Sequence, residues 1–186
     1  MGLLSRLLGD KKPAPSSTSP RPAAPVADTP APTSHAAPAE EDTGEGLVDM
    51  FADDHARCDE LWAACEAATE DQAAFVAAVE AFDTATRRHL QMEEDILFPA
   101  FEDATGMKGF GPPTIMRQEH EQMRGLLDAV LDAARAGDID GALDQGDTLL
   151  MITQQHNVKE EQVLYPMAED VLGATWPDLR DKLARY

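Results

Sequence analysis

Residues 89–99, HLQMEEDILFP, indicate the architecture of this chain because the same pattern returns at residues 156–166 as HNVKEEQVLYP. Each copy has a histidine, a glutamate four residues later, a second glutamate beside it, and a closing aromatic-proline pair. A lone histidine precedes each copy, His55 before the first and His120 before the second. The chain therefore predicts two copies of one helical hairpin.

Helical periodicity surrounds both copies. Apolar residues recur at three- and four-residue steps, which is typical of amphipathic helices that bury one face. Four such stretches are present, at about 47–69, 71–98, 114–135 and 139–171. Long helices joined by short connections favour an all-α, up-down-up-down four-helix bundle.

Proline, glycine and hydroxyl residues predict the boundaries of these helices. Pro99 predicts a break after the second helix, and residues Thr105 to Pro113, with three glycines, predict a loop. Thr114 predicts an N-cap region for the third helix. Pro177 predicts the start of a short C-terminal helix that ends near the last residue.

Ile96 and Val163 fall on the inward stripes of the second and fourth helices, so we expect them to be buried.

The first 45 residues differ from the rest in composition. Eight of the 13 prolines lie between Pro13 and Pro38, among many alanines, serines and threonines. Such a segment buries too little apolar surface to offset its ordering entropy. We therefore expect a disordered tail over residues 1–45 and a folded domain over residues 46–186.

Charge and composition exclude several classes of partner. The net charge is -20, most of it on residues 46–186, and a surface this acidic repels phosphate backbones and anionic lipid heads. We therefore expect no nucleic-acid partner. No apolar run approaches the length of a membrane span. Cys58 and Cys65 suggest no disulfide framework, which predicts buried free thiols and a cytoplasmic location.

A set of polar residues on the inward stripes predicts a metal site. A single core histidine is usually a hydrogen-bonded structural residue, and a charged helix face is usually solvated. Here, however, each helix supplies one inward histidine, and two of them are followed by a glutamate on the same face. Buried carboxylates without a cation would be strongly destabilising. The predicted metal ligands are His55, His89, Glu93, His120, His156 and Glu160.

The types of ligand narrow the choice of metal. Mixed imidazole and carboxylate ligands suit iron, zinc or manganese. Two carboxylates that can each bridge argue for two ions, with His55 and His89 on one ion and the other two histidines on the second. If an oxo or hydroxo group also bridges the ions, each has five ligands. An octahedral iron then keeps one position free for dioxygen, nitric oxide or peroxide.

Several other polar residues of the same helices are either exposed to solvent or in contact with the predicted ligands. We expect solvated faces for four glutamates and regard hydrogen bonding to the ligands as the alternative. For Tyr165 we expect a packing role first, because it aligns with Phe98 in the repeat, and an approach to the metal site is the alternative. The four glutamates are Glu94, Glu119, Glu121 and Glu161.

At these residues, over about 47–171, the chain resembles the hemerythrin-like, or HHE cation-binding, family. The motif H…HxxxE…H…HxxxE and the LFP and LYP segments carry the resemblance. Oxygen-carrying hemerythrins have a second histidine four residues from the one that corresponds to His120, whereas this chain has Met116 and Arg124 at those two positions. They also have an aspartate five residues after the last histidine, whereas this chain has Glu160 four residues after His156. The six-ligand pattern is more similar to di-iron proteins of iron-sulfur cluster repair. The resemblance implies a cofactor of two non-haem iron ions with an oxo or hydroxo bridge.

The resemblance is compatible with three hypotheses for the function. The first is a protein that binds dioxygen, nitric oxide or peroxide for sensing, storage or stress response. The second is enzyme-like: iron donation for cluster repair, or reduction of nitric oxide or peroxide. The third is a metal-stabilised interaction domain. The ferritin-like di-iron bundle is the alternative fold, but its ExxH spacing is the reverse of the HxxxE spacing here.

Overall fold

A computed structural model describes residues 45–186 as a single helical unit, with no strand among those residues. The predicted tail, except for its last residue, lies outside the described part of the chain. None of the described helices combines the length and apolar character that crossing a membrane requires. The elements in chain order are α1 (Leu47–Ala67), α2 (Gln72–Met92), η1 (Glu93–Leu97), α3 (Phe98–Thr105), α4 (Pro112–Ala136), α5 (Ile139–Lys159), η2 (Glu160–Leu164), α6 (Tyr165–Leu172), η3 (Gly173–Thr175) and α7 (Trp176–Leu183).

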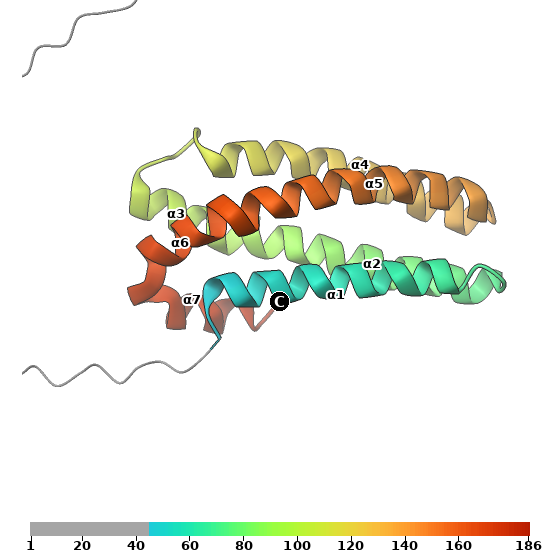
Figure 1. Cartoon of the computed structure of the whole chain (residues 1–186), viewed down its shortest axis with the longest axis horizontal. Coiled ribbons are helices and arrows are strands. Elements are labelled where there is room, and N and C mark those ends of the chain that lie inside the picture. The colour runs from blue at the N-terminus through green and yellow to red at the C-terminus, as the bar shows by residue number, and fades with distance from the viewer. Residues whose placement is uncertain (1–44) are drawn as a thin grey trace, which may run out of the picture. The chain divides into compact units, whose positions relative to one another are not determined.

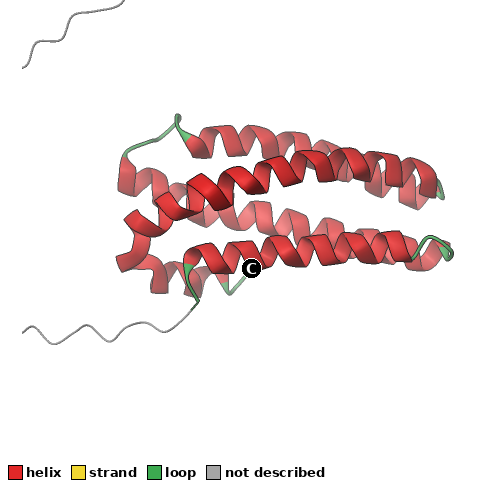
Figure 2. Ribbon diagram, viewed as in Figure 1, coloured by secondary structure: helices red, strands yellow, loops and turns green. Residues whose placement is uncertain are grey.

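The four long helices α1, α2, α4 and α5 form the predicted up-down-up-down bundle (Figure 1). The α1–α2 and α4–α5 turns lie at one end, and α3, α6 and α7 extend the other end. Only short loops join the helices (Figure 2). Helix α2 packs against both α1 and α4, and α4 packs along α5, whereas α1 and α5 make few contacts with each other. The bundle is therefore closed least tightly between its first and last long helices.

The predicted break at Pro99 is wrong. Helix α2 continues through η1 into α3, and α5 continues in the same way through η2 into α6. Both η1 and η2 are π-helical turns, in which Phe98 N–H donates to Glu93 C=O and Tyr165 N–H donates to Glu160 C=O. The wider turn changes the hydrogen-bond register just before the proline, so the missing proline N–H breaks no regular α-helical ladder there.

The π turns also correct the predicted inward stripes. Each inserts one extra residue into the helical repeat, so the buried face moves on by one position. Val163 is 50% exposed and Ile96 is only partly buried, while the residues that follow them are fully buried. These buried residues are Leu97, Phe98, Leu164 and Tyr165.

Turn residues set the other boundaries. Helix α4 begins at Pro112 and not after a Thr114 cap, because Gly111 precedes it with φ 82° and two prolines fill its first turn. Asp71 and Asp138 accept backbone N–H bonds at the starts of α2 and α5. The predicted short C-terminal helix is α7, which begins at Trp176.

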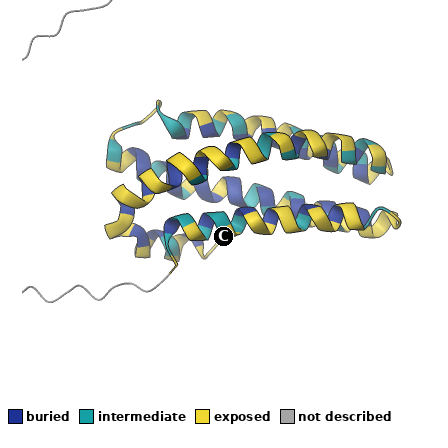
Figure 3. Cartoon of the chain, in the orientation of Figure 1, coloured by how far each residue is buried: buried dark blue, intermediate teal, exposed yellow. Residues whose placement is uncertain are grey.

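The core consists of two apolar clusters along the bundle, and the inner faces of the helices are buried (Figure 3). One cluster includes Phe51, Phe98 and Tyr165 near α3, α6 and α7. The other includes Trp62 and Leu127 toward the helix turns. The predicted metal ligands belong to neither cluster, and they form a buried polar layer along the same inner faces.

Both cysteines are buried free thiols, as predicted. Burial raises the pKa of Cys58 and of Cys65 to about 11, so both stay protonated and unreactive near neutral pH.

Candidate metal centre

The structure brings all six predicted ligands together in the polar layer. Helices α1, α2, α4 and α5 each supply one histidine, and the two π turns each begin with one of the glutamates. All six side chains are buried, and Glu93, His120 and Glu160 have no exposed surface. The six residues that the sequence pattern predicts as ligands therefore lie in one buried cluster.

The imidazoles meet in two pairs. His55 Nε2 lies 3.0 Å from His89 Nε2, and His120 Nε2 lies 3.1 Å from His156 Nε2. This is the pairing that the internal repeat predicts, with one hairpin for each pair. Two donor atoms at right angles on one ion, each about 2.1 Å from it, are about 3 Å apart. Each pair thus has the spacing of two neighbouring ligands on a single metal ion.

Each histidine has a carboxylate behind its other ring nitrogen. The Nδ1 atoms contact Glu161 at 2.8 Å, Asp54 at 3.2 Å, Glu94 at 2.7 Å and Glu119 at 3.0 Å, for His55, His89, His120 and His156 respectively. A carboxylate at Nδ1 holds the proton there and turns the Nε2 lone pair inward. Three of these carboxylates also pair with a base, namely Arg88, Arg124 or Lys159.

These carboxylates correct one expectation. Glu94, Glu119 and Glu161 hydrogen-bond to the histidines, which was the alternative to the solvated faces that we expected for them. Glu121 has a side chain that is 81% exposed, as expected. Sequence reasoning missed Asp54, although its position next to His55 in the chain was a usable signal.

The donor set fits a bound cation better than an empty polar layer. If Nδ1 carries the proton in each histidine, the Nε2 lone pairs of each pair face one another at about 3 Å, which is repulsive without a positive charge between them. Glu93 Oε2 and Glu160 Oε1 are also buried without a hydrogen-bond partner. Glu160 Oε1 lies 3.0 Å from His156 Nε2, but the two atoms are not aligned as a hydrogen bond. Metal coordination would satisfy all of these atoms.

Without a metal, protons take over this role. Burial lowers the pKa of His120, but hydrogen bonds to Glu93 and Glu94 outweigh burial and raise it to about 9. Burial raises the pKa of Glu160, but its contacts with His156 and His55 outweigh burial and lower it well below its ordinary value. The metal-free centre therefore holds imidazolium and carboxylate together, and metal uptake must release protons.

The six residues divide into two unequal groups of mutually close donor atoms. One group contains Glu93, His120, His156 and Glu160, and the other contains His55, His89 and Glu160. Glu160 is common to both, with Oε1 facing His156 and Oε2 lying 3.4 Å from His55 Nε2. Glu160 therefore faces both histidine pairs, and Glu93 Oε2 also contacts a histidine of each pair, at 3.3 Å from His120 Nε2 and 3.5 Å from His89 Nε2.

A seventh polar group lies in the centre. The Tyr165 hydroxyl is 2.8 Å from Glu93 Oε1, 3.0 Å from Glu160 Oε2 and 3.2 Å from His55 Nε2. The alignment with Phe98 put packing first, which describes the ring, and the approach to the site, which was the alternative, describes the hydroxyl. The hydroxyl is the one chemical difference between Tyr165 and Phe98, and it was the sequence signal that could have indicated a polar role for Tyr165.

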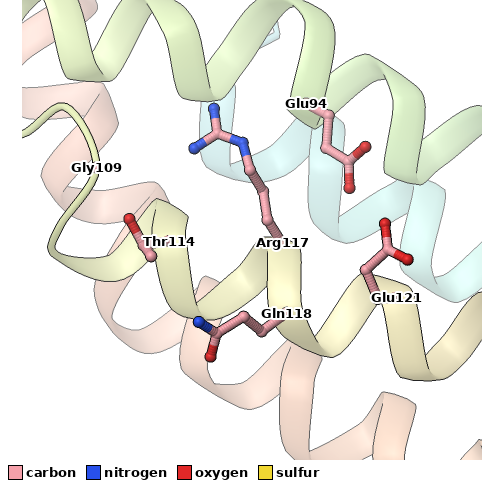
Figure 4. A pocket seen from close by; sticks show the side chains of 6 residues that line it. All are labelled: Glu94, Gly109, Thr114, Arg117, Gln118 and Glu121. Carbon is pink, nitrogen blue, oxygen red and sulfur yellow. The ribbon is translucent and has the colours of Figure 1, made fainter.

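Surface hollows flank the centre on two sides. One lies between α1 and α5 and is lined by His55, Glu161 and neighbouring residues of both helices. Another lies beside α4 and is lined by Glu94, Arg117 and Glu121; Figure 4 shows Glu94 and Glu121 pointing toward one another across it. The first hollow is lined by a predicted metal ligand, so it offers a short approach from solvent.

The comparisons with known proteins agree with this geometry. A family model described as the hemerythrin HHE cation-binding domain matches residues 46–168. No match was found among curated proteins or solved structures. The matched segment spans α1 to α6 and contains the complete cluster of buried histidines and glutamates. The chain belongs to the hemerythrin HHE cation-binding family.

Proposed function

We propose that this chain is a non-haem di-iron protein that binds a small diatomic molecule or peroxide. The observation that carries the proposal is the dry polar layer, in which two pairs of imidazole Nε2 atoms, 3.0 and 3.1 Å apart, flank the shared carboxylate of Glu160. Mixed imidazole and carboxylate donors suit iron, as they also suit zinc or manganese. A bound iron pair would supply positions where dioxygen, nitric oxide or peroxide coordinates.

The protein's own residues would perform distinct tasks. His55 and His89 would hold one iron, His120 and His156 the other, and Glu160 would bridge them. Glu93 would be a ligand of the second iron, and its Oε2, which lies 3.3 Å from His120 Nε2 and 3.5 Å from His89 Nε2, would also be within reach of the first. The carboxylates behind the histidines keep the Nδ1 protons in place and orient the rings.

The hollow at His55 would admit a small ligand. It lies where α1 and α5 make few contacts, and Glu161 forms part of its lining with a side chain that is 40% exposed. Among the four carboxylates behind the histidines, Glu161 has no basic partner among the described residues. It is therefore less firmly held than the other three.

Metal analysis and spectroscopy test this proposal. We expect protein purified in air to contain nearly two irons per chain. After anaerobic reduction, addition of dioxygen or nitric oxide should give a stable adduct that is reversed by removing the gas. Two tightly bound zinc ions with no iron uptake would refute the di-iron assignment.

The same experiment separates the other functions. Repeated consumption of nitric oxide or peroxide would instead indicate an enzyme-like function, and transfer of the iron to a cluster apoprotein would indicate a part in cluster repair. If replacement of iron by zinc leaves binding of a protein partner unchanged, the metal has a structural role only.

A further inference from the structure

We propose that the Tyr165 phenolic oxygen is a seventh protein ligand of the metal centre, bound to the ion that His55, His89 and Glu160 hold. This inference rests on the dinuclear metal centre proposed above. It makes the two metal positions chemically different, one with a phenolate ligand and one without.

The distances around Tyr165 match those among the other donor atoms. Its oxygen lies 3.2 Å from His55 Nε2 and 3.0 Å from Glu160 Oε2. The paired histidine nitrogens are 3.0 and 3.1 Å apart, which is the spacing of adjacent ligands around one ion. An ion that accepts His55 and Glu160 as neighbours is therefore within reach of the Tyr165 oxygen.

The count of donors shows a vacancy that this oxygen fills. The compact group of donor atoms on the His120 side contains four residues, whereas the group on the His55 side contains three. Glu93 Oε2 lies 3.3 Å from His120 Nε2 and 3.5 Å from His89 Nε2, and Glu93 Oε1 lies 2.8 Å from the Tyr165 oxygen. With Tyr165 included, the group on the His55 side also contains four residues.

The hydroxyl group is poorly satisfied as a simple hydrogen-bond donor. It carries one proton but lies within hydrogen-bond distance of an oxygen from each of two carboxylates. Only one of those carboxylates can accept the proton, so the other oxygen–oxygen contact is repulsive. A cation at the His55 side removes that conflict.

The internal repeat shows that the ring position is fixed independently of the hydroxyl. Phe98 takes the equivalent position in the other hairpin and stacks on His120 at 5.6 Å, while the Tyr165 ring lies 5.7 Å from His55. Tyr165 also stacks on Phe51 at 5.1 Å and is fully buried. The packing thus holds the oxygen at the centre and excludes water from it.

Coordination would exchange one bond for another without a redox change. The phenol O–H bond breaks, the oxygen–metal bond forms, and the proton leaves to solvent. A bound cation favours the deprotonated form of a coordinating group, so the phenol would lose its proton when the metal binds.

Optical and resonance Raman spectra of the full-length ferric protein test the inference. Ferric iron bound by phenolate gives a charge-transfer band in the visible range, and excitation in that band enhances tyrosine ring vibrations. The chain has only two tyrosines, Tyr165 and the exposed Tyr186, which donates to Asp95. We expect the band in the wild type and in Tyr186→Phe, and its complete loss in Tyr165→Phe.

The outcomes separate this inference from the di-iron proposal. Two irons per chain without tyrosine Raman modes in the wild type would overturn the Tyr165 ligand and leave the di-iron centre standing. Persistence of those modes in Tyr165→Phe would overturn it as well. Absence of bound iron in the wild type would remove both proposals. Because the wild-type Raman spectrum decides by itself, a folding defect in the Phe variant does not block the test.

Discussion

Glu160→Gln should remove both metal ions, whereas Glu93→Gln should remove about one. The reason is that Glu160 is the one residue common to both compact groups of donor atoms, while Glu93, whose Oε2 lies 3.3 Å from His120 Nε2 and 3.5 Å from His89 Nε2, belongs to only one of them. Each variant replaces a fully buried carboxylate by an amide of nearly the same size, so the side-chain volume is kept and the charge is lost.

The size of the effect follows from the burial of these charges. Removing one partner of a buried charge pair costs about 3–5 kcal/mol. At 1.4 kcal/mol per factor of ten, that weakens metal binding by about 10²- to 10⁴-fold. In Glu160→Gln the loss applies to both ions. In Glu93→Gln the group of His55, His89 and Glu160 remains complete.

Metal content after dialysis against a weak chelator, together with titration calorimetry, measures this difference. Glu66→Gln, a change at an exposed position of α1, is the control and should keep two ions. Equal losses in the Glu93 and Glu160 variants would refute the assignment of Glu160 as the shared ligand. Retention of two tightly bound ions in Glu160→Gln would refute the centre itself.

Three further predictions follow from contacts around the polar layer. Glu94→Gln changes the side chain that lies 2.7 Å from His120 Nδ1, and it should weaken metal affinity by about 10- to 100-fold. In a metal titration the number of ions bound at saturation should stay the same. Unchanged affinity would contradict the role of Glu94. The pKa of His120 in the folded, metal-free protein is raised from 6.5 to about 9, so its stabilising effect is complete below pH 6.5 and lost as the pH rises through 9. Urea unfolding of metal-free protein should therefore show a decrease of up to about 3 kcal/mol between those pH values, and a flat or rising profile would disprove it. Gly146→Ala should destabilise the fold by about 1–3 kcal/mol in thermal unfolding, because its new Cβ would lie 1.9 Å from the Trp62 ring; Gly125→Ala, where a Cβ meets nothing, is the control.

The periodicity and the repeat were enough to predict the helical bundle and the membership of the polar layer. Inward positions recur every three or four residues, so His55, His89, His120 and His156 could be placed on buried faces from their spacing alone. Glu93 and Glu160 followed because a residue four positions from a histidine shares its face. The same arithmetic predicted which histidines come from the same hairpin.

Spacing along the chain could not reveal the π turns. Each adds one residue to a turn, which turns Val163 outward and brings Tyr165 inward. That extra residue is tolerated because the packing of the aromatic residue and the turn's altered hydrogen bonds stabilise it. Local periodicity carries no sign of either.

Contacts between helices were equally beyond a one-dimensional pattern. The distance and the relative rotation of two helices decide which carboxylate hydrogen-bonds to which histidine. Asp54 of α1 therefore contacts His89 of α2, although it is the chain neighbour of His55. The hydroxyl of Tyr165 reaches Glu93 from 72 positions away. Sequence period fixes the face on which a side chain lies, but only the packing of four helices decides which atoms on those faces come within bonding distance.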